Sequence, residues 1–162
     1  MAGQSSAKSV EIDKKVPAFS RPSTGGGTWK LSDVAGKKLV LYFYPKDDTS
    51  GCTREAQDFT ALAEEFAKES TWVLGVSKDN PDKHRKFTDK YDLKVKLATD
   101  ADGSVCEAFG TWIEKSMYGR KYMGIDRATF LIDRDGTIAR IWRKVKVPGH
   151  AEEVLKAARE LP

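Results

Sequence analysis

Residues 39–52 read L-V-L-Y-F-Y-P-K-D-D-T-S-G-C, and this stretch decides the fold. Its first six residues are apolar or aromatic without alternation, which is typical of a central strand covered on both faces. Pro45 ends that strand. From Ser50 to Glu69 the apolar residues recur every three or four positions, which predicts an amphipathic helix. Cys52 therefore lies in the first helical turn, where free backbone N–H groups and the helix dipole favour thiolate over thiol.

The segments on either side of this stretch predict further strands and helices. A hairpin near the N-terminus is expected from strand candidates at 16–19 and 28–31 around a run of three glycines, 25–27. Downstream we expect a strand over 71–77, a helix over 81–91, a short strand over 97–99 and a small helix that carries Cys106. Strands that alternate with helices in this way indicate an α/β fold with a parallel sheet.

The C-terminal third predicts an antiparallel edge for that sheet. Apolar runs at 128–133 and 137–142 flank Arg134-Asp135-Gly136, and Asp-Gly between two such runs is a strong hairpin signal. Residues 112–125 have mixed polarity and are expected to form a long connection, and a last helix is expected over 151–160. The fold class is therefore α/β, with a central mixed sheet flanked by helices and an N-terminal hairpin extension. We expect a flexible tail over 1–12 and a single domain over 13–162.

Composition limits the classes of function. The chain has 162 residues, of which 40% are hydrophobic, but no apolar run approaches the ~20 residues of a membrane span. The first residues lack the apolar core of a secretory signal, so a cytoplasmic location is expected. The net charge of +4 is mild, and the basic stretch 140–146 is interrupted by apolar residues as in a strand with one wet face. Neither a membrane nor a nucleic acid is therefore an expected partner.

Two cysteines and two histidines offer little for metal chemistry. Cys52 and Cys106 are too few for a disulfide scaffold, and their spacing resembles no zinc site. His84 and His150 lie among charged or turn residues, and neither is assigned to a metal or to catalysis. We expect no metal and no cofactor.

Two distant segments carry a resemblance to a known family. The spacing Pro45-x-x-x-Thr49-x-x-Cys52, within F-Y-P-K-D-D-T-S-G-C-T-R-E-A, resembles the peroxiredoxins, in particular their bacterioferritin-comigratory-protein or Q-type group. The stretch 124–133, G-I-D-R-A-T-F-L-I-D, resembles the arginine-bearing strand of the same group. The resemblance spans roughly residues 10 to 160. It implies a thioredoxin-like fold and a thiol peroxidase that reduces hydrogen peroxide and organic hydroperoxides.

The resemblance also implies a role for each site residue. Cys52 is the sulfur that attacks the peroxide and becomes a sulfenic acid. The Arg127 guanidinium can hold the thiolate and orient the peroxide together. The Thr49 hydroxyl can bridge sulfur and substrate, and Pro45, which has no N–H, can wall the pocket. Glu55 is left open between an ion pair that fixes Arg127 and an ordinary acidic residue in a helix's first turn.

The sequence departs from the group at Gln57, where many members place a second, resolving cysteine five residues after the first. The expected cycle is therefore of the one-cysteine type, with thioredoxin, glutaredoxin or a low-molecular-weight thiol as the reductant. An internal disulfide between Cys52 and Cys106 is the alternative. A monomer is expected by analogy with the group, and a weak dimer remains an alternative.

Two rival functions use the same cysteine. A thioredoxin-like disulfide reductase needs Cys-x-x-Cys at the helix start, but here Cys52 is followed by Thr53-Arg54-Glu55. A peroxide-sensing redox relay would use Cys52 as well, and only catalytic turnover separates it from a peroxidase.

Overall fold

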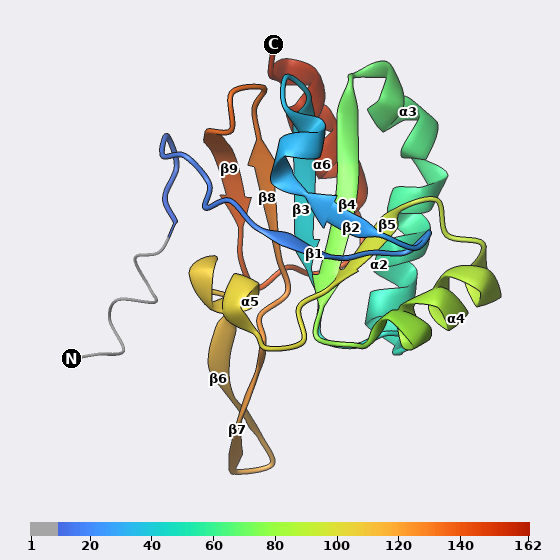
Figure 1. Cartoon of the computed structure of the whole chain (residues 1–162). Helices are drawn as coiled ribbons and strands as arrows, with labels where there is room; N and C mark the ends of the chain where they lie inside the picture. Colours follow the sequence, from blue (N-terminus) through green and yellow to red (C-terminus); the bar gives the residue numbers. More distant parts are fainter. Residues whose placement is uncertain (1–9) are drawn as a thin grey trace.

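The computed structural model describes residues 10–162 and centres on a five-stranded sheet with the strand order β5-β4-β3-β8-β9 (Figure 1). The strands are β3 (Lys38–Phe43), β4 (Thr71–Ser77), β5 (Lys96–Thr99), β8 (Ala128–Ile132) and β9 (Ile138–Trp142). Strands β3, β4 and β5 are parallel, whereas β8 and β9 add antiparallel pairings. The predicted central mixed sheet and the predicted Asp-Gly hairpin are both confirmed.

Helices cover both faces of this sheet. They are α2 (Ser50–Ala61), α3 (Ala63–Lys68), α4 (Pro81–Tyr91), α5 (Ser104–Ala108) and α6 (His150–Glu160), with a short 3-10 helix, η1 (Leu31–Val34). The single helix predicted from Ser50 to Glu69 is thus two helices, interrupted at Leu62, where ψ is 10°. Within residues 10–162 no helix combines the length and the apolar character needed to cross a bilayer.

Strand β3 divides the interior into two apolar cores, because alternate residues of a strand point to opposite faces. Leu41 and Phe43 belong to the core that also holds α5 and the N-terminal segment. Val40 and Tyr42 belong to the other core, which lies under α2, α3, α4 and α6. Residues 39–44 are all buried, as their unbroken apolar run predicted, and so is Lys38 at the start of β3. The chain therefore leaves the carboxyl end of this central, buried strand directly before α2 begins.

The N-terminal hairpin is confirmed, but its first strand begins later than predicted. β1 (Ser20–Pro22) pairs with β2 (Thr28–Lys30), and together they form a separate two-stranded sheet. The expected strand at 16–19 is absent from the described hairpin, because the backbone N–H of Val16 donates instead to the carbonyl of Gly136 in the β8–β9 turn.

Most of the tail predicted over 1–12 falls on residues 1–9, which lie outside the described residues. Val10, inside the predicted tail, is 6% exposed and packs with the core that contains Phe43. Burial of this apolar side chain stabilises its position. The division at residue 12 between a tail and a domain stays a prediction.

Residues 112–125 form a hairpin and not the connection predicted from their mixed polarity. β6 (Trp112–Met117) pairs with β7 (Arg120–Ile125) around a two-residue turn at Tyr118 and Gly119, both with positive φ. Most of its side chains are exposed, so neither face shows the alternation by which strands are recognised. Figure 1 shows this hairpin projecting from the body of the molecule.

Candidate active site around Cys52

The candidate site lies at the loop between the end of β3 and the start of α2. Thr49 occupies the N-cap position with extended backbone angles, and its carbonyl accepts the N–H of Thr53 at 2.8 Å. Cys52 is the third residue of the helix and is 2% exposed. The sulfur is therefore held in the first turn of α2, as predicted, at the positive end of the helix dipole.

Sheet register brings Arg127 to this cysteine. Phe43, the last residue of β3, pairs with Ala128, the first residue of antiparallel β8. Arg127 therefore reaches the carboxyl end of β3 just before its own strand begins. Its Nη2 donates to the sulfur of Cys52 at 3.4 Å. The antiparallel pairing of β3 with β8 therefore brings Cys52 and Arg127 together, as predicted.

Glu55 holds the other side of the same guanidinium. Nη1 of Arg127 donates to Oε1 of Glu55 at 2.7 Å, and the Glu55 side chain is 1% exposed. Within residues 10–162 its Oε2 has no hydrogen-bond partner. Burial raises the pKa of the Glu55 carboxyl to about 7, and the charge and hydrogen bond of Arg127 oppose this rise. The ion pair predicted as one reading of Glu55 is present in the structure.

Gly51 is a site residue that the sequence analysis missed. A Cβ built on Gly51 would lie 3.2 Å from Nη2 of Arg127, which is tighter than ordinary van der Waals contact. Glycine therefore lets the guanidinium approach the first turn of α2. Its position directly before Cys52, in a helix start where glycine is unfavourable for propensity, was the available signal.

Thr49 and Pro45 lie on the solvent side of the site. Both residues are exposed, and the Thr49 hydroxyl donates to the carbonyl of Lys46 at 2.8 Å. That bond fixes the hydroxyl within the β3–α2 loop and leaves its lone pairs free to accept. Lys115 of β6 adds a second cation nearby: burial lowers its pKa, with Asp126 and Cys52 opposing that shift.

Cys106 lies apart from the candidate site. It is fully buried on α5, and it belongs to the core that faces away from α2, whereas Cys52 belongs to the core beneath α2. Burial raises the pKa of the Cys106 thiol well above its ordinary range, and the neighbouring Asp100 adds to the rise. Both cysteines are free thiols. The sheet thus separates the two sulfurs of the alternative cycle.

The two histidines are buried and bonded, contrary to the surroundings expected for them. His150 is 6% exposed and its Nε2 lies 2.8 Å from the Thr129 hydroxyl. Burial lowers the pKa of His150 to about 4. His84 is 1% exposed and lies 2.7 Å from Asp47. The burial of the two histidines could not be predicted from their charged neighbours in the sequence, because those neighbours lie on the outward faces of α4 and α6.

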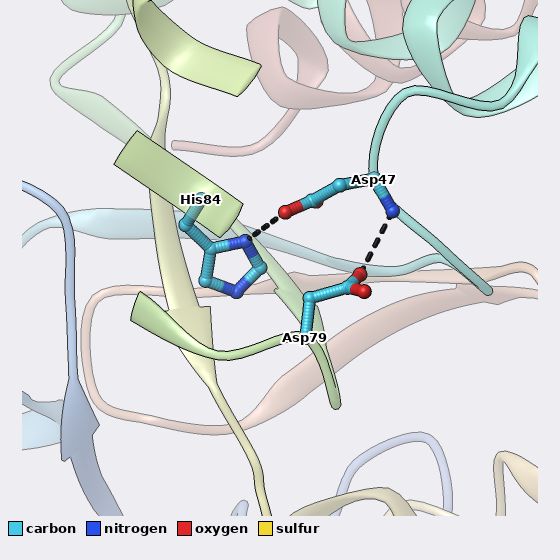
Figure 2. A group of neighbouring side chains, drawn as sticks. All are labelled: Asp47, Asp79 and His84. Atoms are coloured by element: carbon cyan, nitrogen blue, oxygen red, sulfur yellow. Dashed lines mark hydrogen bonds and ion pairs between the residues drawn. The ribbon is translucent and has the colours of Figure 1, made fainter. Parts of the chain in front are cut away.

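Asp47, Asp79 and His84 form one group whose side chains could hold a metal ion, since one ligand atom from each lies within 4.8 Å of the others (Figure 2). Their polar atoms already bond to protein groups. His84 Nδ1 donates to Asp47, and one oxygen of Asp79 accepts from the Asp47 backbone N–H and from the Ser77 hydroxyl. The group therefore forms a closed hydrogen-bond network between the β3–α2 loop and α4.

The chain is similar to known proteins over most of its length. The profile of the AhpC/TSA family matches residues 12–141. Peroxiredoxin Bcp of Bacillus subtilis is 45% identical over 152 residues, which are 94% of this chain and 97% of the relative. Peroxiredoxin Bcp of Escherichia coli K12 is 41% identical over 144 residues, with 89% and 92% covered.

Solved structures agree in fold as well as in sequence. Peroxiredoxin Q of Xanthomonas campestris has a TM-score of 0.84 and 44% identity, and 88% of this chain and 90% of that chain are covered. Bacterioferritin comigratory protein of the same organism, in a structure concerned with its alkyl peroxide reduction activity, has a TM-score of 0.86 and 42% identity, with 93% and 98% covered.

Proposed function

This chain belongs to the AhpC/TSA family, as a thiol peroxidase of the Bcp and peroxiredoxin Q group with a thioredoxin-like fold, and from that premise we propose the residues and the cycle through which it reduces peroxides. One observation carries the assignment of residues. A sulfur in the first turn of α2 accepts a hydrogen bond from an arginine that is itself fixed by a buried carboxylate.

The first half of the proposed cycle oxidises Cys52. Its thiolate attacks one peroxide oxygen, the S–O bond forms, the O–O bond breaks, and the other oxygen leaves as hydroxide or alkoxide and takes a proton from water. The product on the enzyme is a sulfenic acid. Arg127 stabilises the charge as it moves from sulfur to the leaving oxygen, because its donors are held in place before the reaction begins.

Thr49 and Pro45 complete the proposed peroxide site. The Thr49 hydroxyl, anchored by its bond to the Lys46 carbonyl, offers lone pairs to the peroxide proton. Pro45 has no N–H and so supplies an exposed wall that does not compete for the thiolate. The substrates proposed are hydrogen peroxide and small organic hydroperoxides, and the alkyl peroxide activity named for the Xanthomonas relative supports this range.

The second half of the proposed cycle uses an external thiol. One external thiol displaces water from the sulfenic acid and forms a mixed disulfide with Cys52. A second external thiol then attacks that disulfide, which releases Cys52 as a thiol and joins the two external thiols in a disulfide. Gln57 cannot resolve the sulfenic acid, and Cys106 lies across the sheet from it. Thioredoxin, glutaredoxin or a low-molecular-weight thiol is the proposed donor.

The proposed setting is a reducing compartment such as the cytoplasm, in which two free thiols persist. A monomer is the proposed working state, with a weak dimer as the alternative. No metal or cofactor takes part in the proposed chemistry.

Turnover by matched cysteine variants tests the cycle. Cys52→Ser should abolish peroxide consumption in the presence of thioredoxin, glutaredoxin or dithiothreitol, while Cys106→Ser should retain it. A Cys52→Ser variant that still turns over would reject the site. After one equivalent of peroxide, mass spectrometry should show a trappable sulfenic acid on Cys52. A Cys52–Cys106 disulfide would overturn the one-cysteine cycle. Oxidation of Cys52 once, without catalytic turnover in the presence of any of the thiol donors, would favour a peroxide-sensing redox relay over a peroxidase.

A further inference from the structure

The loop that carries the catalytic residues is tied to α4 by a buried pair, Asp47 and His84 (Figure 2). Asp47 lies midway between Pro45 and Thr49, and it is 4% exposed although its neighbours on either side are exposed. A buried carboxylate is costly unless its oxygens are bonded. The position of Asp47 therefore depends on what it bonds.

Asp47 makes three hydrogen bonds, each to a different part of the fold. Its Oδ1 accepts from the Tyr44 hydroxyl at 2.5 Å, at the end of β3. Its Oδ2 accepts from Nδ1 of His84 at 2.7 Å, on α4. Its backbone N–H donates to Oδ2 of Asp79 at 2.8 Å, just before α4 begins. These bonds fix both the side chain and the backbone of the loop at its middle residue.

His84 is placed so that each ring nitrogen faces an acceptor. Nδ1 faces the Asp47 carboxylate, and Nε2 lies 3.2 Å from the carbonyl oxygen of Ala98 in β5. Carboxylate and carbonyl oxygens only accept, so a ring nitrogen bonds to either of them only as a donor, and a donating nitrogen presents no lone pair to a cation. This geometry favours a hydrogen-bonded fastening over a metal site.

A second tie between the same loop and helix lies at the surface. Asp48 has a left-handed φ of 62°, and its carboxylate accepts from Lys90 Nζ at 2.9 Å and from the Tyr91 hydroxyl at 2.7 Å. Asp48 and Lys90 are exposed and Tyr91 is half-buried, so water and salt weaken the ion pair between Asp48 and Lys90. Two adjacent residues thus contact one helix, one through a buried bond and one through a screened bond.

We propose that Asp47 and His84 are positioning residues of the peroxidase, which hold the β3–α2 loop so that Thr49 and the first turn of α2 stand in their reactive arrangement. The inference rests on the proposed function of Cys52. Neither residue touches the sulfur, so both act through the loop. A displacement of about 1 Å in such a site can cost about 10²-fold in rate, so loss of the hydrogen bond between Asp47 and His84 should be measurable in the rate of Cys52 oxidation.

Two amide substitutions of His84 separate its two bonds. The amide nitrogen of asparagine stands where Nδ1 stands, so His84→Asn keeps the donor to Asp47 and loses the donor to Ala98. The amide nitrogen of glutamine stands where Nε2 stands, so His84→Gln does the reverse. We expect His84→Gln and Asp47→Asn to slow Cys52 oxidation by about 10-fold or more, and His84→Asn to stay within about 3-fold of wild type.

The measurements are stopped-flow oxidation by hydrogen peroxide, the pH midpoint of Cys52 alkylation, and the melting temperature. Slow oxidation and a shifted midpoint in His84→Gln, rescued in His84→Asn at an equal melting temperature, support the inference. Equal losses in both His84 variants that follow the melting temperature would overturn it, because α4 would then only stabilise the fold.

Three controls separate the remaining outcomes. Asp48→Asn, which cuts the surface tie, should remain within about 2-fold of wild type, and an equal loss there would overturn the assignment to the buried pair. Cys52→Ser in the same assay tests the proposed function alone: if it is inactive while His84→Gln is fully active, only the positioning role fails. Stoichiometric zinc binding to the wild type that is lost in His84→Gln would replace the fastening with a metal site.

Discussion

Nη2 of Arg127 lies 3.4 Å from the sulfur of Cys52, and Nη1 of the same guanidinium lies 2.7 Å from Oε1 of Glu55. The sheet creates this contact, since β8 starts beside the end of β3. A planar group that donates to a sulfur and to a carboxylate oxygen at once is available from arginine and not from lysine. The proposed site thus depends on the shape of the guanidinium as much as on its charge.

Arg127→Ala should slow Cys52 oxidation by about 10² to 10³-fold, because a fixed donor at the reacting atoms is lost. Arg127→Lys should recover only part of that loss, since one ammonium cannot serve both partners. Stopped-flow fluorescence against hydrogen peroxide measures both rates. The control is Arg134→Ala, which removes an exposed arginine that bonds the carbonyls of Gly36 and Pro162. An Arg127→Ala variant with the wild-type rate would remove this residue from the site.

Gly51→Ala should lower activity without lowering stability. The added Cβ would meet Nη2 of Arg127 at 3.2 Å and push the guanidinium away from the sulfur. Alanine also favours a helix over glycine by about 1 kcal/mol, so the melting temperature should hold or rise. We expect oxidation about 3- to 10-fold slower than wild type. Gln57→Ala, at an exposed position of the same helix, is the control, and an unchanged rate in Gly51→Ala would show that Arg127 does not need this space.

Glu55→Gln should flatten the pH dependence of stability. Burial raises the pKa of Glu55 from 4.5 to about 7, so between these values the folded state holds a proton that the unfolded chain releases. Stability from this group is therefore complete below about pH 4.5 and is lost as the pH rises through about 7, by up to roughly 3 kcal/mol.

Urea unfolding at pH 5 and pH 7.5 measures this loss in the wild type and in Glu55→Gln. The pKa of His150 is lowered to about 4, which gives an opposite trend, but the two proteins share that histidine and the difference between them isolates Glu55. Identical pH profiles would contradict the raised pKa.

Gly75→Ala should destabilise the fold by about 1–3 kcal/mol through overpacking. A Cβ on Gly75 would lie 2.7 Å from a ring carbon of Tyr42 and 2.9 Å from Leu97, all of them in the sheet core. The free energy of unfolding in urea measures the effect, and peroxide turnover per folded molecule should stay close to wild type. A change below about 0.5 kcal/mol would mean that the Tyr42 ring moves aside freely.

The elements predicted correctly from sequence are those with strong local signals. The apolar run of β3, its end before Pro45 and the start of α2 at Ser50 are adjacent in the chain, and each follows from a short pattern. Arg127 and Glu55 were predicted through resemblance, and the distances then placed them together. Propensity and periodicity thus suffice where a feature is built from neighbouring residues.

Features built from distant residues escaped prediction. His84 gains its importance from Asp47, and no local pattern relates those two positions. The β6–β7 hairpin is held by backbone pairing between largely exposed strands, so burial left no alternating trace in its sequence. The face of the sheet on which Cys106 lies is likewise fixed by packing, which a short helix of five residues does not reveal.

The placement of Cys52 and Cys106 on opposite sides of one sheet has a consequence for endurance under oxidant stress. In the proposed cycle no cysteine of the same chain can form a disulfide with the sulfenic acid at position 52. The sulfenic acid therefore persists until an external thiol reacts with it, and during that time a second peroxide molecule can oxidise it further. Each encounter in that interval can convert it to the irreversible sulfinic form. The lifetime of the enzyme is then set by the ratio of donor to oxidant around it, so scarcity of donor is the condition that consumes the enzyme itself.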